Sequence, residues 1–90
     1  MRTYSEFGAV VVNGMPHVVT PVCDEMRHLV CLPYDLSLLH AMAEAMKIKR
    51  CWFHKNHYDI PKTRIKEITA RCKLVSTKEI LNIIRGNEQK

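Results

Sequence analysis

The chain has 90 residues, of which 47% are hydrophobic and 26% charged, and its formal net charge is +5 at pH 7. A chain of this length buries about 60–65% of the surface that it exposes when unfolded, so one core can form without disulfides or a structural metal. The composition argues against a disordered chain. The positive charge favours an anionic partner, although it is also compatible with plain solubility.

These properties predict one domain over residues 1–90, made of an N-terminal hairpin (1–22), an α/β core (23–86) and a tail (87–90). The first residues lack the apolar core of a signal peptide, and no apolar run approaches the roughly 18 residues of a membrane span. We therefore expect a cytoplasmic protein with no membrane partner. The cysteines are widely spaced and form no Cys-x-x-Cys pair, which favours reduced, buried thiols over a redox motif or a zinc ribbon.

Two apolar, β-branched runs, Ala9–Val12 and 15–22, flank the dipeptide Asn13-Gly14. Asn-Gly between such runs is a strong hairpin signal, because a type I′ turn requires positive φ at both central residues. We therefore predict an N-terminal β-hairpin. Pro16 cannot donate a hydrogen bond within a sheet, so its part of the second strand should lie at an edge or a bulge.

The middle of the chain alternates short apolar runs with a helical pattern. The apolar run His28–Leu32 predicts a strand. Between residues 36 and 48, apolar residues recur at spacings of three and four, which indicates a helix with one core-facing side, capped by Asp35 or Ser37. Residues 50–54 form a short segment that contains Trp52 and Phe53, which predicts a short buried strand.

The last third of the chain predicts two more helices around a short strand. An apolar stripe indicates a helix over about residues 61–71, and residues 73–75 form a short apolar run. Ser76 and Glu79 then have the spacing of a capping box, in which each side chain satisfies an unpaired backbone N–H. The final helix should end at Gly86, because glycine favours the left-handed conformation that terminates helices.

After the hairpin, the predicted order is strand, helix, strand, helix, strand, helix. This order is typical of a small three-layer Rossmann-like α/β domain, in which right-handed crossovers make the central strands parallel. Ligands of such sheets bind beyond the carboxyl ends of the strands. Those ends should bring together Asp24 and Glu25, residues 54–59, and Ser76 and Thr77. We expect a ligand at this shared rim.

Part of the sequence resembles a known family. The similar stretches are residues 24–31, 39–43, 52–53 and 57–61, and the His-Tyr-Asp segment is the most specific of them. Over about residues 22–86 the chain resembles the domain-of-unknown-function family numbered 4031, small proteins of bacteria and phages. At positions 24 and 25, family members more often carry two aspartates. The resemblance implies a compact α/β domain and brings no established activity.

The central segment offers ligands for a metal ion. His57 and Asp59 are two residues apart, so an extended backbone directs both side chains to one face, and His54 joins them if the intervening residues form a turn. With Asp24 or Glu25, they could hold a divalent ion and activate water for phosphodiester hydrolysis. In the alternative interpretation, Asp59 only caps the following helix and the histidines face solvent.

Binding of an anionic ligand requires a less exact arrangement of side chains than binding of a metal ion. Phosphate groups are bound by cationic side chains, hydroxyl groups and helix N-termini, and an exposed tyrosine can stack on a base. The candidate ligand-binding residues are Arg27, His28, His54, Lys55, Tyr58, Lys62, Arg64 and Thr77. The alternative is an ordinary solvated basic surface. Lys47, Lys49 and Arg50 follow the first helix and should instead complement its C-terminal dipole.

Two functions follow from these residues. The first is a non-catalytic binding module that recognises nucleic acid, a nucleotide or an acidic host protein through the rim. The second is a small metal-dependent phosphodiester hydrolase that uses Asp24, Glu25, His57 and Asp59. We prefer the binding module, because nucleases usually gather three or four carboxylates and most acidic residues of this chain lie elsewhere. A divalent ion is the only cofactor that the residues suggest. The sequence does not identify a catalytic residue.

Overall fold

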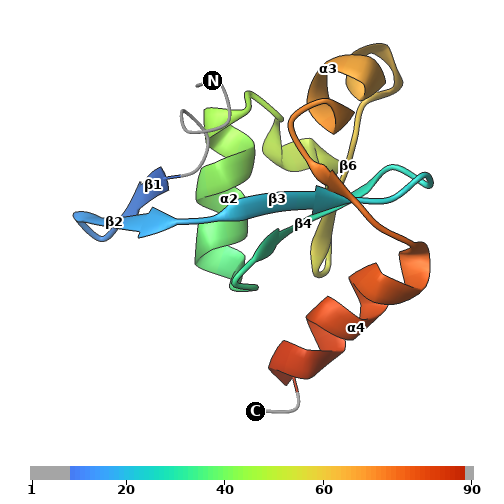
Figure 1. The fold of residues 1–90 in the computed structure, drawn as a ribbon. Helices are drawn as coiled ribbons and strands as arrows, with labels where there is room; N and C mark the ends of the chain where they lie inside the picture. The colour runs from blue at the N-terminus through green and yellow to red at the C-terminus, as the bar shows by residue number, and fades with distance from the viewer. Residues whose placement is uncertain (1–8, 89–90) are drawn as a thin grey trace.

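The computed structural model describes residues 9–88, so residues 1–8 of the predicted hairpin segment and the last two residues of the predicted tail lie outside the described part. The described chain is a mixed α/β fold with helices α2, α3 and α4 and two sheets (Figure 1). Its strands are β1 (Ala9–Val12), β2 (Met15–Val18), β3 (Thr20–Cys23), β4 (His28–Leu32), β5 (Phe53–His54), β6 (His57–Asp59) and β7 (Lys73–Leu74). Its helices are α2 (Leu36–Ala45), α3 (Ile65–Thr69) and α4 (Thr77–Glu88), with 3₁₀ turns η1 (Arg50–Trp52) and η2 (Lys62–Arg64).

The larger sheet has five strands in the order β5-β6-β4-β3-β7. Neighbouring strands are antiparallel except β3 and β7, which are parallel. The α/β class is therefore right, but the predicted Rossmann-like arrangement with parallel central strands is wrong. The connections explain the difference: residues 24–27 join β3 to β4 and residues 55–56 join β5 to β6. Loops this short connect antiparallel strands, whereas parallel neighbours require a long crossover.

The smaller sheet is a hairpin of β1 and β2, in which Ala9 lies opposite Val18. Its turn has positive φ at both central residues, 54° at Asn13 and 78° at Gly14, as a type I′ turn requires. The apolar run 15–22, predicted as one strand, is divided at Val19 into β2 and β3. The hairpin therefore leads directly into the central sheet.

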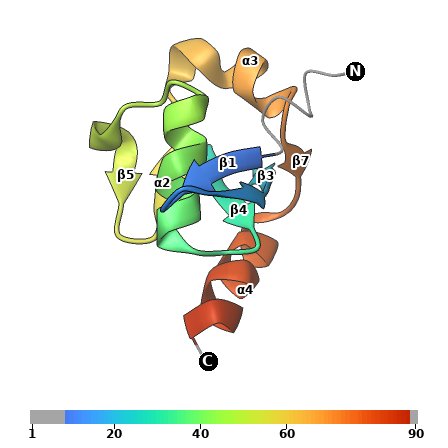
Figure 2. The ribbon, with the colours of Figure 1, turned by 90° about the vertical axis from the view of Figure 1, so that its left-hand side faces the viewer.

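Helices cover both faces of the five-stranded sheet (Figures 1 and 2). On one face, α2 buries Leu39 and Met42 in a cluster that includes Leu29 of β4. On the other face, α4 completes a second cluster of Val22, Val30, Ile80 and Ile84. Because successive residues of a strand point to opposite faces, β4 can supply both clusters. Asp35 caps α2 by accepting a hydrogen bond from the Leu38 N–H at 3.1 Å, as predicted.

Three boundaries differ from those predicted. Residues 50–54 form the turn η1 followed by the two-residue strand β5, and the predicted helix over 61–71 is divided into η2 and α3. Ser76 caps α4 as predicted, because its Oγ accepts a hydrogen bond from the Glu79 N–H at 3.2 Å. Helix α4 nevertheless continues through Gly86 to Glu88, since one helical glycine costs only about 1 kcal/mol. No helix in residues 9–88 is long and apolar enough to cross a membrane.

Candidate functional site

Neighbouring strands of the larger sheet bring together the histidines of the central segment. His28 of β4 lies opposite Asp59 of β6, and His54 of β5 lies opposite His57 of β6. His57 and Asp59 are two residues apart and share one face, whereas Tyr58 between them points into the core beneath α2. The register of three strands thus gathers His28, His54, His57 and Asp59, which we call the histidine cluster.

The turn between β5 and β6 is what allows His54 to join the cluster. Lys55 occupies the left-handed region with φ 50°, and β5 and β6 pair on either side of it. The hydroxyl of Tyr34 donates a hydrogen bond to the Asn56 carbonyl at 2.7 Å, which fixes the turn against the chain before α2. Residues 55–56 therefore form the turn that the metal hypothesis needed for His54 to join His57 and Asp59.

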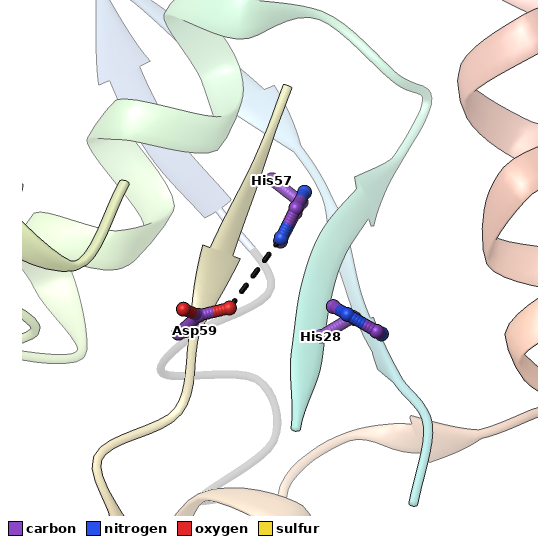
Figure 3. A group of neighbouring side chains, drawn as sticks. All are labelled: His28, His57 and Asp59. Carbon is purple, nitrogen blue, oxygen red and sulfur yellow. Dashed lines mark ion pairs between the residues drawn. The ribbon is translucent and has the colours of Figure 1, made fainter. Parts of the chain in front are cut away.

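Asp59 lies between two of the histidines. The Nε2 atom of His54 is 3.1 Å from Asp59 Oδ2, and the Nε2 atom of His57 is 3.4 Å from Asp59 Oδ1. The rings of His28 and His57 meet edge to face with centroids 4.8 Å apart. Figure 3 shows His57 and Asp59 on β6 and His28 on the neighbouring strand β4. One carboxylate and three imidazoles therefore share one patch of the sheet.

Asp24 links this cluster to the N-terminus of α4. Its carboxylate accepts hydrogen bonds from the backbone N–H groups of Met26 and His28, each at 2.9 Å. The Nδ1 atom of His28 is 2.8 Å from Asp24 Oδ2, and the Thr77 hydroxyl donates to the same oxygen at 2.7 Å. Asp24 is 2% exposed, so it is a buried anion whose charge is met by neighbouring donors.

Two ionisable groups of the site have shifted affinities for protons. Burial opposes the ionisation of Asp24, but hydrogen bonds from His28 and Thr77 outweigh it and hold the pKa of this carboxyl below its usual range. Burial, with the nearby His28, lowers the pKa of His57. Asp24 is thus a carboxylate at neutral pH, and His57 favours the neutral form that can bind a metal ion.

The predicted metal ligands are only partly brought together. His57 and Asp59 are adjacent, but the carboxylate of Asp24 is occupied by internal donors and Glu25 is exposed on the turn before β4. In residues 9–88, the group of side chains able to hold a metal ion is His28, His57 and Asp59, with ligand atoms within 4.8 Å of one another. His28 was predicted only as a ligand for anions. Pairing of β4 with β6 placed it here, and no local sequence signal reveals such a pairing.

Several side chains predicted to bind an anion form hydrogen bonds to other groups of the protein. Tyr58 is 1% exposed, and its hydroxyl lies 2.8 Å from His40 Nδ1, so it cannot stack on a base. Arg27 donates to the Ile60 carbonyl at 3.0 Å, and Thr77 donates to Asp24. These interactions connect β-strands and loops, which the sequence could not reveal. The predicted ligands that remain exposed are Lys55, Lys62 and His54.

Arg64 contacts the C-terminus of α2. Its guanidinium donates to the carbonyls of Met46 and Lys47 at 2.8 and 2.7 Å, and it pairs with Glu67 at 2.7 Å. Its predicted role as a ligand for anions stays a prediction. The guanidinium neutralises the negative end of the α2 dipole, the role we had assigned to the basic residues directly after that helix.

An open groove of about 600 Å³ borders the Asp24 network on the side of α4. It is lined by Glu25, Met26, Leu74, Val75, Ser76 and Thr77. Met26 and Leu74 are 65% and 58% exposed, so its walls include apolar side chains in contact with solvent. Thr77 belongs to both features, because it lines the groove and donates to Asp24.

The four thiols differ in burial. Burial raises the pKa of Cys31 to about 11, so this thiol stays protonated at neutral pH. A hydrogen bond with Cys23 raises the pKa of Cys72 as well. Cys51 is exposed, against the expectation of buried thiols. Cys31 is therefore not a thiolate nucleophile at neutral pH.

The fold and site define a small mixed α/β protein with a histidine and carboxylate cluster on one face of its central sheet. The chain belongs to the family described as "Protein of unknown function (DUF4031)", which matches residues 15–87. The resemblance to this family is thereby confirmed, and the match also includes β2, which precedes the segment where we expected it to begin. No curated protein and no solved structure matches the chain.

Proposed function

We propose that the protein is a non-catalytic binding module that recognises an anionic partner, nucleic acid before others, through the surface around the histidine cluster. The proposal is supported by the exposure of the charged side chains near the cluster. Lys55 and Lys62 are exposed, and the His54 side chain is 62% exposed. The carboxylate side chains are less accessible, at 0% for Asp24 and 29% for Asp59. A partner therefore meets mainly cationic and imidazole groups.

The net charge of the chain acts in the same direction. A charge of +5 on a protein of 90 residues attracts polyanions over a Debye length of about 8 Å at physiological salt. The strand β5 is an edge of the sheet, so the turn carrying Lys55 projects at a border of the molecule. Lysines in such a position bind phosphate groups without reading base sequence. An acidic host protein surface, which suits a phage or bacterial protein, is the other partner with this chemistry.

Charge reversal tests the proposal. Binding of a fluorescein-labelled 20-nucleotide single strand would be measured by anisotropy between 50 and 300 mM salt, with EDTA present, for the wild type and K55E/K62E. The control K49E/K66E makes the same change in net charge at exposed lysines after α2 and on α3. K55E/K62E should weaken binding by about tenfold or more and reduce the salt slope by about 2, whereas the control should retain most of both. Equal losses in both variants, or no binding by the wild type, would contradict the proposal.

A metal-dependent phosphodiester hydrolase is a second candidate. The proximity of His57 and Asp59, 3.4 Å apart, favours it, and His28 replaces Asp24 among the ligands. Hydrolysis of bis(p-nitrophenyl) phosphate with added manganese, measured for the wild type and D59N, separates it from the binding module. Turnover that requires manganese and is lost in D59N would make the protein an enzyme.

A further inference from the structure

We propose that His28, His57 and Asp59 form a binding site for one divalent transition-metal ion, of the class of Zn²⁺, Mn²⁺, Fe²⁺, Co²⁺ and Ni²⁺. This site goes beyond the proposed recognition of an anionic partner, which depends on exposed lysines and requires no metal. Two imidazoles and one carboxylate would hold the ion, and its remaining coordination positions would face solvent.

The distances fit such an ion. Metal–ligand bonds of about 2.1 Å at tetrahedral angles place two ligand atoms about 3.4 Å apart. His57 Nε2 and Asp59 Oδ1 are separated by 3.4 Å, so these ligands are already at the required spacing. The ligand atoms of all three residues lie within 4.8 Å of one another. The His28 side chain is 30% exposed, so solvent and ions reach it.

Each of the three ligands also has an outer partner that orients it. Asp24 Oδ2 lies 2.8 Å from His28 Nδ1, and an N–H on Nδ1 that donates to this oxygen leaves Nε2 for a metal ion. Asn56 Oδ1 does the same for His57 at 3.0 Å. Metal-binding histidines almost always donate their second N–H to such an acceptor.

The third ligand has a partner of its own. His54 Nε2 lies 3.1 Å from Asp59 Oδ2 and holds the carboxylate so that Oδ1 turns toward His57. The Thr77 hydroxyl completes the outer layer by donating to Asp24. A purely structural ion pair needs one partner for each charge, whereas this arrangement supplies an outer partner for every candidate ligand. The outer layer is therefore the observation that distinguishes a metal site from a chance cluster.

The sheet makes the site both rigid and accessible (Figure 3). His28 and Asp59 are directly opposite each other on paired strands, so backbone hydrogen bonds fix the spacing of their Cα atoms. The side chains of His57 and Asp59 are 22% and 29% exposed, so an ion can enter without a change in the fold.

The ligand set selects the class of ion. Imidazole nitrogen suits zinc, cobalt, nickel and iron, whereas calcium and magnesium prefer oxygen ligands. Asp24 and Asp59 place two carboxyl groups at the site, which suits a cation. We therefore expect binding of transition metals and none of Mg²⁺ or Ca²⁺ at matched concentrations.

Metal binding would be measured on the full chain, stripped with EDTA and dialysed. Because the exposed thiol of Cys51 can bind soft metals, all variants would carry Cys51→Ser. Titration with Co²⁺ followed by visible absorption, and with Zn²⁺ and Ni²⁺ by calorimetry, should give one ion per chain and a rise in Tm. Mg²⁺ and Ca²⁺ should give neither.

Variants locate the ion. Asp59→Asn and His57→Gln should each abolish the Co²⁺ spectrum, and Asp24→Asn, a positioning variant, should weaken binding by about 10–100-fold. His17→Gln removes an imidazole from β2 and should leave metal binding unchanged. Circular dichroism identifies any variant that fails to fold, and His28→Gln then replaces it.

The results separate this inference from the proposed function. Absence of Co²⁺, Zn²⁺ and Ni²⁺ binding by the C51S protein would overturn the metal site, as would unchanged affinity in both Asp59→Asn and His57→Gln. Oligonucleotide binding in EDTA that depends on Lys55 and Lys62 would still support the binding module. Loss of oligonucleotide binding with intact metal binding would remove the module and keep the metal site.

Discussion

The two faces of the central sheet receive side chains from the same strands but differ in chemistry. Toward α2, β4 and β6 direct Leu29 and Tyr58, which are 0% and 1% exposed. Toward α4, the same strands direct His28, His57 and Asp59, which remain partly exposed. The difference follows from coverage, because α4 packs on Val22 and Val30 of β3 and β4. Polar residues thus occur where no apolar neighbour would bury them.

Leu39→Ala against His57→Ala is the comparison with the largest expected effect. Leu39 is a fully buried residue of α2, so its truncation should cost about 2–5 kcal/mol of unfolding free energy. His57→Ala should cost less than about 1 kcal/mol, because it removes a partly exposed side chain from the polar face. Urea denaturation followed by circular dichroism measures both. Similar losses would show that the polar face is as important for stability as the core.

Asp24→Ala tests whether the polar face has a structural centre of its own. Its removal takes the acceptor from the N–H groups of Met26 and His28 and from the Thr77 hydroxyl, which should cost about 2–4 kcal/mol. Thr77→Val, which removes one donor and keeps the carboxylate, should cost about 1 kcal/mol. If Asp24→Ala were no worse than Thr77→Val, the carboxylate would not hold this region together. The same urea titration provides the readout.

Arg64→Ala examines the end of α2. The guanidinium satisfies two terminal carbonyls of this helix, so its loss should cost about 1–2 kcal/mol. Lys62→Ala, an exposed neighbour in the same turn, should change stability by less than about 0.5 kcal/mol. Oligonucleotide affinity should respond in the opposite order, falling for Lys62→Ala only. A loss of affinity in Arg64→Ala with unchanged stability would make Arg64 part of the binding surface.

The smallest expected effect concerns His40, on the α2 side. Burial, with the charge of Arg50, lowers the pKa of His40, whose Nδ1 lies 2.8 Å from the Tyr58 hydroxyl. The unfolded chain therefore binds a proton more readily, so stability should fall as pH decreases below about 6.5, the unfolded value. His40→Gln should flatten this part of the profile. Melting temperatures between pH 5 and 7.5 test it, and an unchanged profile in the variant would exclude His40 as its source.

Local features were predictable from the sequence, and long-range pairing was not. Asn13-Gly14, the Asp35 cap and the Ser76 cap depend on interactions within a few residues, and each occurs in the structure. The spacing of His57 and Asp59 likewise fixed their common face. The antiparallel sheet was missed because β6 is only three residues long and gives no periodic signal. That omission also concealed His28 as a neighbour of His57.

The bond between Thr77 and Asp24 joins positions 53 residues apart in the chain. β3, β4 and the β5–β6 hairpin are synthesised before Thr77, the residue that completes the Asp24 network. A chain that stops before Thr77 carries His28 on a strand whose outer face lacks Ile80 and Ile84. Such a chain should expose Val22 and Val30 to solvent, and exposed apolar surface of this kind promotes aggregation during folding.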